Sequence, residues 1–146
     1  MTRNKQEAFT LMEIMIAMVV LGILATLAIP GVMRMREKIR VNQTKAVMAS
    51  LETAINDYRE DIGHFPTQQE GGLEALVVRP RGPAAQKWDG PYLKGKTELP
   101  QDAWGNDYEL NLGAAIKNKA KHKYYEIISY GPAGPEDEKD IMFTGE

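Results

Sequence analysis

The sequence predicts an α+β fold in which one long N-terminal helix packs on a small antiparallel β-sheet, beside a long loop rich in proline and glycine. Three observations predict this fold: an uncharged apolar run near the N-terminus, a periodic apolar pattern that follows it, and two β-like segments in the second half. A chain of 146 residues, 43% of them hydrophobic, can build one small globular core.

The charge and the residue inventory exclude several classes of function. With 18 basic and 20 acidic side chains, the chain has no basic field that would favour a nucleic-acid partner. The absence of cysteine removes disulfides, thiolate zinc sites, iron–sulfur clusters and a cysteine nucleophile. His64 and His122 stand apart from any close group of acidic residues, so they are predicted to be ordinary surface or loop histidines.

Residues 14–33 form an apolar run of about 20 residues without a charge. A helix of that length spans roughly 30 Å, the thickness of a bilayer's hydrocarbon core. Basic residues flank both ends of the run, at Arg3 and Lys5 and again from Arg34, so the charge rule does not orient it. The alternative is a secretory signal peptide cut after Ala28, although the run is longer than the apolar region of most signal peptides.

Glu13 immediately precedes the apolar run, at the expected membrane boundary. An unpaired carboxylate there costs on the order of 2.5–3.5 kcal/mol. A cut between Ala8 and Phe9 would create a positively charged amine four residues before Glu13, on the same helical face. The amine could pair with Glu13 of its own chain or of a neighbour, and the second pairing would set the register of packed helices. A glutamate simply placed at the interface is the alternative.

The predicted helix continues beyond the membrane segment, because apolar residues recur mostly at steps of three and four. These residues are Met35, Ile39, Val47, Leu51, Ile55, Tyr58 and Ile62. Gly63 is predicted to end the helix, and Pro66 prevents its resumption. Gly22 and Pro30 lie in the membrane half. Pro30 lacks a backbone donor, so a kink or local melting is expected there, with extension on assembly.

Beyond Gly63 the sequence predicts one short helix near residues 69–77, a Pro/Gly-rich loop, and strands at 107–112 and 123–130. Trp88, Tyr92 and Trp104 are expected to anchor the loop to the core. Between the strands, lysines alternate with small or polar residues, a pattern typical of a solvated connector or a protected sheet edge. These lysines are Lys117, Lys119, Lys121 and Lys123.

Residues 90–97 match the nucleotide-binding pattern G-x-x-x-x-G-K-[ST] letter for letter. The mechanism of that pattern needs a strand before the loop and a helix after it. Pro91 and Pro100 disfavour both, so the sequence predicts no nucleotide site.

The segment AFTLMEIMIAMVVLGILATLAIP resembles the leader junction and N-terminal helix of type IV pilins and type II secretion pseudopilins. The resemblance implies that a prepilin peptidase cleaves after Ala8, where glycine is usual, and N-methylates Phe9. Glu13 then becomes the acidic fifth residue of that family. The chain would divide into a leader (1–8), a transmembrane and filament-core helix (9–33) and a periplasmic globular domain (34–146).

Two further segments, YREDIGHFPTQQEGGLEAL and GPYLKGKTELPQDAWGNDYEL, resemble the protein G family of major pseudopilins. The resemblance implies a non-enzymatic subunit, single-pass in the inner membrane, that polymerises into a periplasmic pseudopilus supporting export of folded proteins. Its implied partners are further copies of itself, minor pseudopilins, the prepilin peptidase and the inner-membrane assembly platform. A minor pseudopilin or type IV pilin is one alternative. A periplasmic enzyme or binding module released by signal peptidase is another.

The tail concentrates four carboxylates within residues 136–140, and hard oxygen ligands on a Gly/Pro-shaped loop suit Ca²⁺. In the family that the sequence resembles, this loop holds a structural calcium ion. The resemblance implies Asp137 and Asp140 as side-chain ligands and Tyr130 as a backbone ligand. Ala133 occupies the position of a usual aspartate ligand. The alternative is therefore a loop closed by hydrogen bonds and packing alone.

Overall fold

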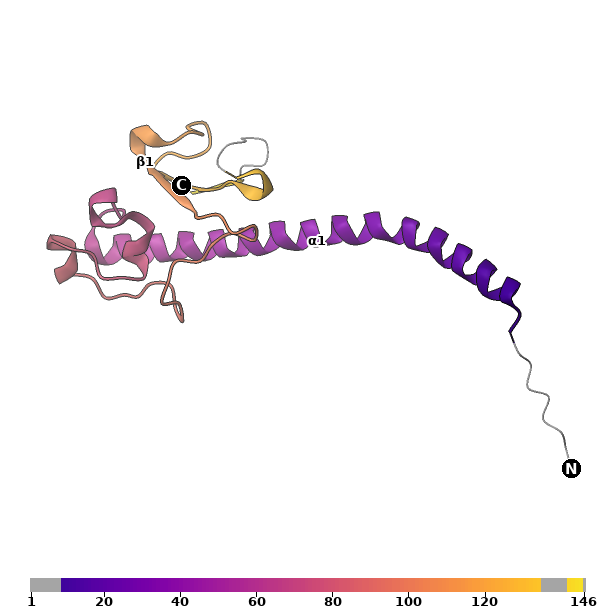
Figure 1. Cartoon of the computed structure of the whole chain (residues 1–146). Helices are drawn as coiled ribbons and strands as arrows, with labels where there is room; N and C mark the ends of the chain where they lie inside the picture. Colours follow the sequence, from indigo (N-terminus) through magenta and orange to yellow (C-terminus); the bar gives the residue numbers. More distant parts are fainter. Residues whose placement is uncertain (1–8, 135–141, 146) are drawn as a thin grey trace, which may run out of the picture. The chain divides into compact units, whose positions relative to one another are not determined.

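The computed structural model describes residues 9–134 and 142–145 (Figure 1). The chain forms two compact units, Met1–Ile39 and Arg40–Glu146. Helix α1 (Leu11–Ile62) contributes to both, which confirms the predicted single long helix. It is helical through Gly22 and Pro30, so melting at these positions stays a prediction for the assembled state. The helix ends where expected, because Gly63 has a φ of 96°.

The second unit is built on one face of α1. The buried members of this face follow steps of four and three, with Ala54 buried beside them: Thr44, Met48, Leu51, Ile55, Tyr58 and Ile62. The predicted apolar stripe is therefore confirmed from Leu51 onward, whereas Met35 and Ile39 are 67% and 49% exposed. The two exposed residues belong to the first unit, which holds no part of the core.

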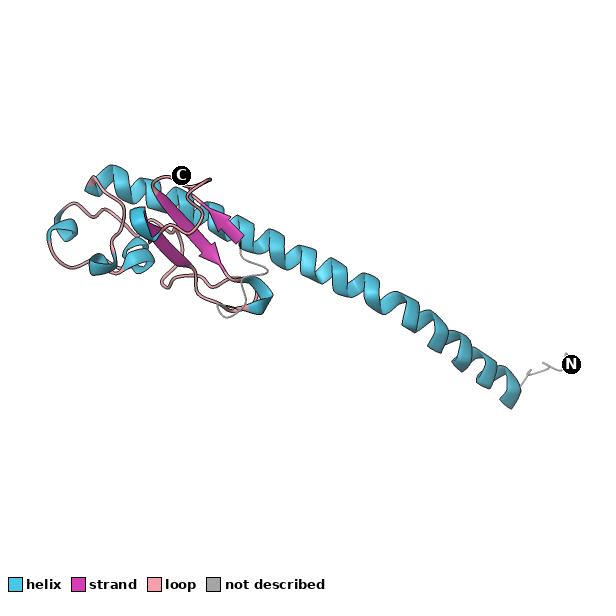
Figure 2. Cartoon of the chain, turned by 90° about the horizontal axis from the view of Figure 1, so that it is seen from above, coloured by secondary structure: helices cyan, strands magenta, loops and turns pink. Residues whose placement is uncertain are grey.

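The sheet has three antiparallel strands in the order β1-β2-β3 (Figure 2). They are β1 (Glu109–Leu112), β2 (Tyr125–Ser129) and β3 (Met142–Thr144). Every residue of the central strand β2 is buried. The two predicted strands are confirmed. The third was not predicted, because a three-residue strand after an acidic loop carries almost no periodic signal.

The helix predicted near residues 69–77 is instead two 3₁₀ helices, η1 (Gln68–Glu70) and η2 (Gly72–Leu76). Gly71 separates them and Gly72 begins η2, with φ values of 103° and 59°, a conformation that an α-helix does not admit. Thr67 and Glu70 form a capping box that starts η1. Three further 3₁₀ helices follow, η3 (Pro83–Gln86), η4 (Gly113–Ala115) and η5 (Gly131–Ala133).

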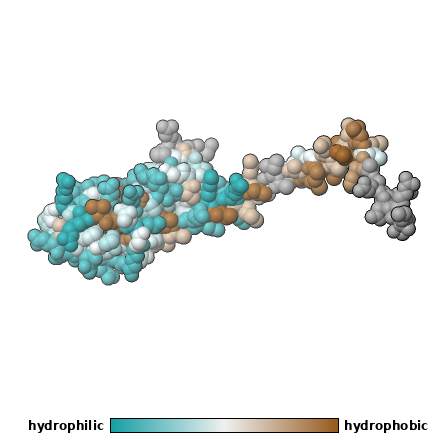
Figure 3. Space-filling view, turned by 60° about the horizontal axis from the view of Figure 1, so that its bottom comes forward, coloured by the Kyte–Doolittle hydropathy of each residue, from teal (hydrophilic) through white to brown (hydrophobic). Residues whose placement is uncertain are grey.

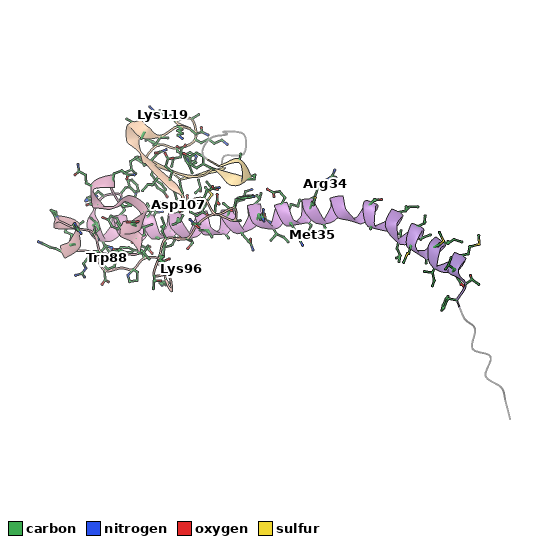
Figure 4. All side chains as sticks on the ribbon, in the orientation of Figure 1. Arg34, Met35, Trp88, Lys96, Asp107 and Lys119 are labelled. Carbon is green, nitrogen blue, oxygen red and sulfur yellow. The ribbon has the colours of Figure 1, made fainter. Side chains whose placement is uncertain are left out.

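Aromatic side chains attach the Pro/Gly-rich loop to the core, as the sequence predicts. The indole Nε1 of Trp88 donates to the carbonyl of Ala75 at 2.7 Å. The hydroxyl of Tyr92 donates to Asp61 on α1 at 2.9 Å, and the Tyr92 ring packs edge-on against Tyr58. Figure 4 shows Trp88 among the side chains of this loop. Trp104 is half-buried. Residues 90–97 are loop, with no helix following, so the flanking elements that a phosphate-binding loop needs are missing from this described segment.

The lysine-bearing connector between β1 and β2 is fixed by one buried carboxylate. Glu126 on β2 is fully buried, and its two oxygens accept the backbone N–H groups of Lys117 and Asn118 at 2.9 and 2.8 Å. The four alternating lysines are exposed, which confirms a solvated connector. His122, also in the connector, is buried, and its Nδ1 lies 3.0 Å from the carbonyl oxygen of Gly145.

Candidate functional site

Glu13, which the sequence marks for register, lies in the first turn of α1. Thr10 caps the helix, because its hydroxyl accepts the backbone N–H of Glu13 at 3.3 Å. Glu13 thus lies at the third helical position, where the helix dipole favours a carboxylate. The local geometry gives Glu13 a stabilising role in a single chain, in addition to the pairing predicted from sequence.

Phe9, the predicted methylated residue, is 77% exposed and directly precedes the cap residue. Ala8 lies outside the described residues. A chain that began at Phe9 would start one residue before the helix cap, with its amine close in sequence to Glu13. The pairing of that amine with Glu13 stays a prediction.

The apolar half of α1, within residues 14–33, is exposed wherever the structure describes its side chains. A segment of α1 is long and apolar enough to cross a membrane, and none of it is buried. Figure 3 shows the apolar surface of this half of the helix. A Cβ atom built on Gly22 would meet nothing within 4 Å, and the same holds for Gly31. Among the residues that the structure describes, no packing contact requires these glycines, so they leave room for close approach of another helix.

A second constellation, which the sequence reasoning did not single out as a site, centres on Asp102. Its Oδ1 accepts the backbone N–H groups of Trp104 and Asn106 at 3.0 and 2.8 Å. Its Oδ2 accepts the hydroxyl of Ser129 at 2.8 Å and the side-chain amide of Asn106 at 3.2 Å. The same amide donates to the carbonyl of Gly131 at 2.7 Å. The network therefore fixes the first residue of η5.

The Asp102 network also reaches α1, because the neighbouring Ala103 N–H donates to the hydroxyl of Thr44 at 3.1 Å. Burial opposes the charge of Asp102, but the hydrogen bonds from Asn106, Ser129 and Trp104 outweigh it and lower the pKa of the carboxyl. Asp102 is thus an ionised, buried junction between α1, the end of β2 and η5. An Asp two residues before a Trp-Gly pair is an Asx-turn signal that sequence reasoning could have used.

Tyr130, the predicted backbone ligand for calcium, lies between β2 and η5. Its hydroxyl donates to Glu109 and accepts from the Nζ of Lys117 at 3.2 Å. Asp137 and Asp140 lie outside the described residues. Among the described residues, no group of three or more His, Asp or Glu side chains is placed to hold a metal ion.

A long N-terminal helix with an unpartnered apolar half and a small antiparallel sheet on its other half define a class, the pilin-like proteins. Residues 3–29 match the prokaryotic N-terminal methylation motif, and residues 31–143 match the family described as type II secretion system (T2SS), protein G. The chain belongs to this protein G family.

Individual relatives agree with the family assignment. The chain is 39% identical over 133 residues to the type II secretion system core protein G of Escherichia coli (strain K12), covering 90% of this chain and 85% of the relative. It is 38% identical over 141 residues to core protein G of Klebsiella pneumoniae, covering 94% of each. Its fold matches the crystal structure of the major pseudopilin from the type 2 secretion system of enterohaemorrhagic Escherichia coli. That match has a TM-score of 0.59 and 30% identity, and covers 77% of this chain and 91% of that one. The predicted fold class and the major-pseudopilin assignment are confirmed.

Proposed function

We propose that this chain is a structural, non-enzymatic subunit that polymerises through α1 into a periplasmic pseudopilus, which supports export of folded proteins across the outer membrane. The observation that carries the proposal is the apolar half of α1, whose large side chains are exposed within the chain. Exposed apolar patches beyond a few hundred Å² mark contact with a membrane or with other proteins. Membership in the protein G family supports both contacts, first with the membrane and then with other copies of the chain.

One apolar surface would serve two environments. Before assembly, residues 14–33 cross the inner membrane and the second unit lies in the periplasm. After extraction, the same side chains pack against the helices of neighbouring copies. Leaving lipid for other helices buries no additional apolar surface, so contacts between helices in such a core depend on close packing. Small residues favour it because they let two helices approach closely. The open surroundings of Gly22 support this role.

The N-terminus would be made by a prepilin peptidase that cleaves after Ala8 and methylates Phe9. The match to the N-terminal methylation motif supports this step. The new amine would then pair with Glu13 of the same or a neighbouring chain and set the register between copies. The assembly platform of the inner membrane and the minor pseudopilins are the further proposed partners, and a separate ATPase would supply the energy.

Calcium binding by the 130–140 loop is a further part of the proposal. The carbonyl of Tyr130 and the carboxylates of Asp137 and Asp140 would hold the ion, whose charge would neutralise the acidic loop. Ala133 offers a methyl group instead of a carboxylate, while the Asp102 network fixes the adjacent Gly131. Closure of the loop by these hydrogen bonds alone is the competing outcome.

Mass spectrometry of the N-terminal peptide tests the proposal most directly. The full chain is expressed with its native prepilin peptidase, and the membrane fraction is digested. We expect a peptide that begins at N-methylated Phe9, together with filaments when the chain is overproduced. A soluble protein that begins at Ile29 would instead identify a signal-peptide product and overturn the proposal. Correct processing without homopolymers would favour a minor pseudopilin.

A further inference from the structure

Beyond the apolar run, α1 carries three cations within five residues, with the exposed carboxylate of Glu37 between the second and the third. Arg34, Arg36 and Lys38 are all exposed, and all lie in the first unit. Among the described residues, none of the three forms an ion pair with a carboxylate. Figure 4 shows Arg34 and its neighbour Met35 leaving the helix in different directions. We refer to Arg34, Arg36 and Lys38 as the basic collar.

The depth of the collar along the helix matches the headgroup layer of a bilayer. Residues 14–33 span about 30 Å of hydrocarbon, which leaves roughly 5–7 Å of headgroups on each side. The rise from Arg34 to Lys38 is about 6 Å at about 1.5 Å per residue. All three cations therefore fall within the phosphate layer when the apolar run fills the bilayer.

The angular distribution of the collar favours lipid over a protein partner. At about 100° per residue, Arg36 lies about 200° around the helix from Arg34, whereas Lys38 lies only about 40° from it. The cations thus point to opposite sides of α1. A docking surface for one protein would gather its charges on one face, but headgroups surround a membrane helix on every side.

The collar also runs against the usual distribution of charge. Cytoplasmic ends of membrane helices carry the excess of Lys and Arg, yet the collar would lie at the opposite end. Arg3 and Lys5, the cations at the cytoplasmic end, belong to the leader and would be lost on processing. We infer that the basic collar binds the headgroups of anionic phospholipids in the outer leaflet of the inner membrane and holds the subunit at a fixed depth before assembly. This inference rests on the membrane insertion proposed above.

The test measures lipid selectivity of the full chain in bilayers of phosphatidylcholine containing phosphatidylglycerol. Spin-labelled phosphatidylglycerol and spin-labelled phosphatidylcholine report which lipid occupies the sites around the helix. The collar variant carries Arg34→Gln, Arg36→Gln and Lys38→Gln. The control carries Lys119→Gln, Lys121→Gln and Lys123→Gln, which removes the same charge from the exposed connector.

We expect the wild type and the control to prefer phosphatidylglycerol, and the collar variant to lose most of that preference. Each cation in the headgroup layer strengthens binding of an anionic lipid up to about fivefold. Raising the salt concentration is expected to weaken the preference as well. An unchanged preference for phosphatidylglycerol in the collar variant overturns the inference. If that variant also fails to form filaments, the cations serve contacts between copies of the chain instead. An equal loss in both variants overturns it too, since net charge alone would explain the binding.

Failure of the membrane proposal gives a different result. If the wild-type chain does not float with the vesicles, insertion of α1 is wrong and the collar inference falls with it. If the chain floats but shows no lipid preference, only the collar inference is wrong.

Discussion

Removing the carboxylate of Asp102 is expected to destabilise the globular unit by about 3 kcal/mol. In Asp102→Ala, the backbone N–H groups of Trp104 and Asn106 and the hydroxyl of Ser129 lose their acceptor. A buried donor without a partner costs about 1–3 kcal/mol. Two of these three donors are only partly buried, so we assign about 1 kcal/mol to each of the three, which gives the expected value. Asp107→Ala is the matched control, because it makes the same substitution at an exposed aspartate.

The assay is urea unfolding of the full chain in detergent micelles, followed by tryptophan fluorescence. The two tryptophans of the chain, Trp88 and Trp104, both lie in the second unit, so the signal reports on that unit alone. A loss below about 1 kcal/mol, or one equal to that of the Asp107 variant, would refute the assignment of Asp102 as a structural junction.

The pH dependence of stability gives an independent check on Asp102. Its pKa is lowered in the folded state, so its contribution is present above the unfolded pKa of about 4 and is lost as pH falls through the folded pKa. The stability of Asp102→Ala should therefore fall less than that of the wild type between pH 5 and 2. If the free energies of unfolding of the two proteins fall equally between pH 5 and 2, the charge of Asp102 contributes nothing to stability.

Four further predictions follow from the helix, the core and the acidic loop. Replacing Glu13 with Ala should leave membrane insertion intact but impair assembly, and filaments of normal abundance on electron micrographs would contradict the register role. Ile55→Ala should cost about 2–5 kcal/mol because Ile55 is fully buried, whereas Ile39→Ala should change urea stability by less than about 0.5 kcal/mol. A chelator should lower the melting temperature if the 130–140 loop binds calcium, and an unchanged value removes the metal. Burial raises the pKa of Tyr108 to about 12, so its stabilising contribution should be lost between pH 10 and 12. Tyr58 and Tyr92 share this raised pKa, so titration of the Tyr108→Phe variant at 295 nm should show a late step that is smaller by one tyrosine.

The elements with strong periodicity could be predicted from sequence, and those held by distant contacts could not. The α1 pattern from Leu51 to Ile62 and the stop at Gly63 carried enough local signal to fix the helix and its buried face. The split of the next helix depends on two consecutive glycines with positive φ, which a hydrophobic pattern does not report. The apolar run at 14–33 was equally readable, because length and lack of charge suffice to mark a candidate membrane span.

The Asp102 network shows the limit of sequence reasoning for the site. Asp102 and Ser129 are 27 residues apart, and only the antiparallel pairing of β1 with β2 brings the end of β2 to the loop before β1. The predictions for Phe9 and Glu13, by contrast, rest on a few neighbouring residues at the expected membrane boundary. A polar network that closes through tertiary structure has no comparable local signature.

The buried carboxylate of Glu126 has a consequence for how the surface of this protein can change. Glu126 holds the connector through backbone N–H groups, which every residue except proline supplies. The side chains that follow, at positions 119–121, are exposed and have no part in that anchor. The connector can therefore acquire new side chains, or accept an inserted tag, while the sheet beneath it keeps its register. The connector is thus an exposed part of the second unit in which homologous subunits can diverge without altering the helix α1 that they share.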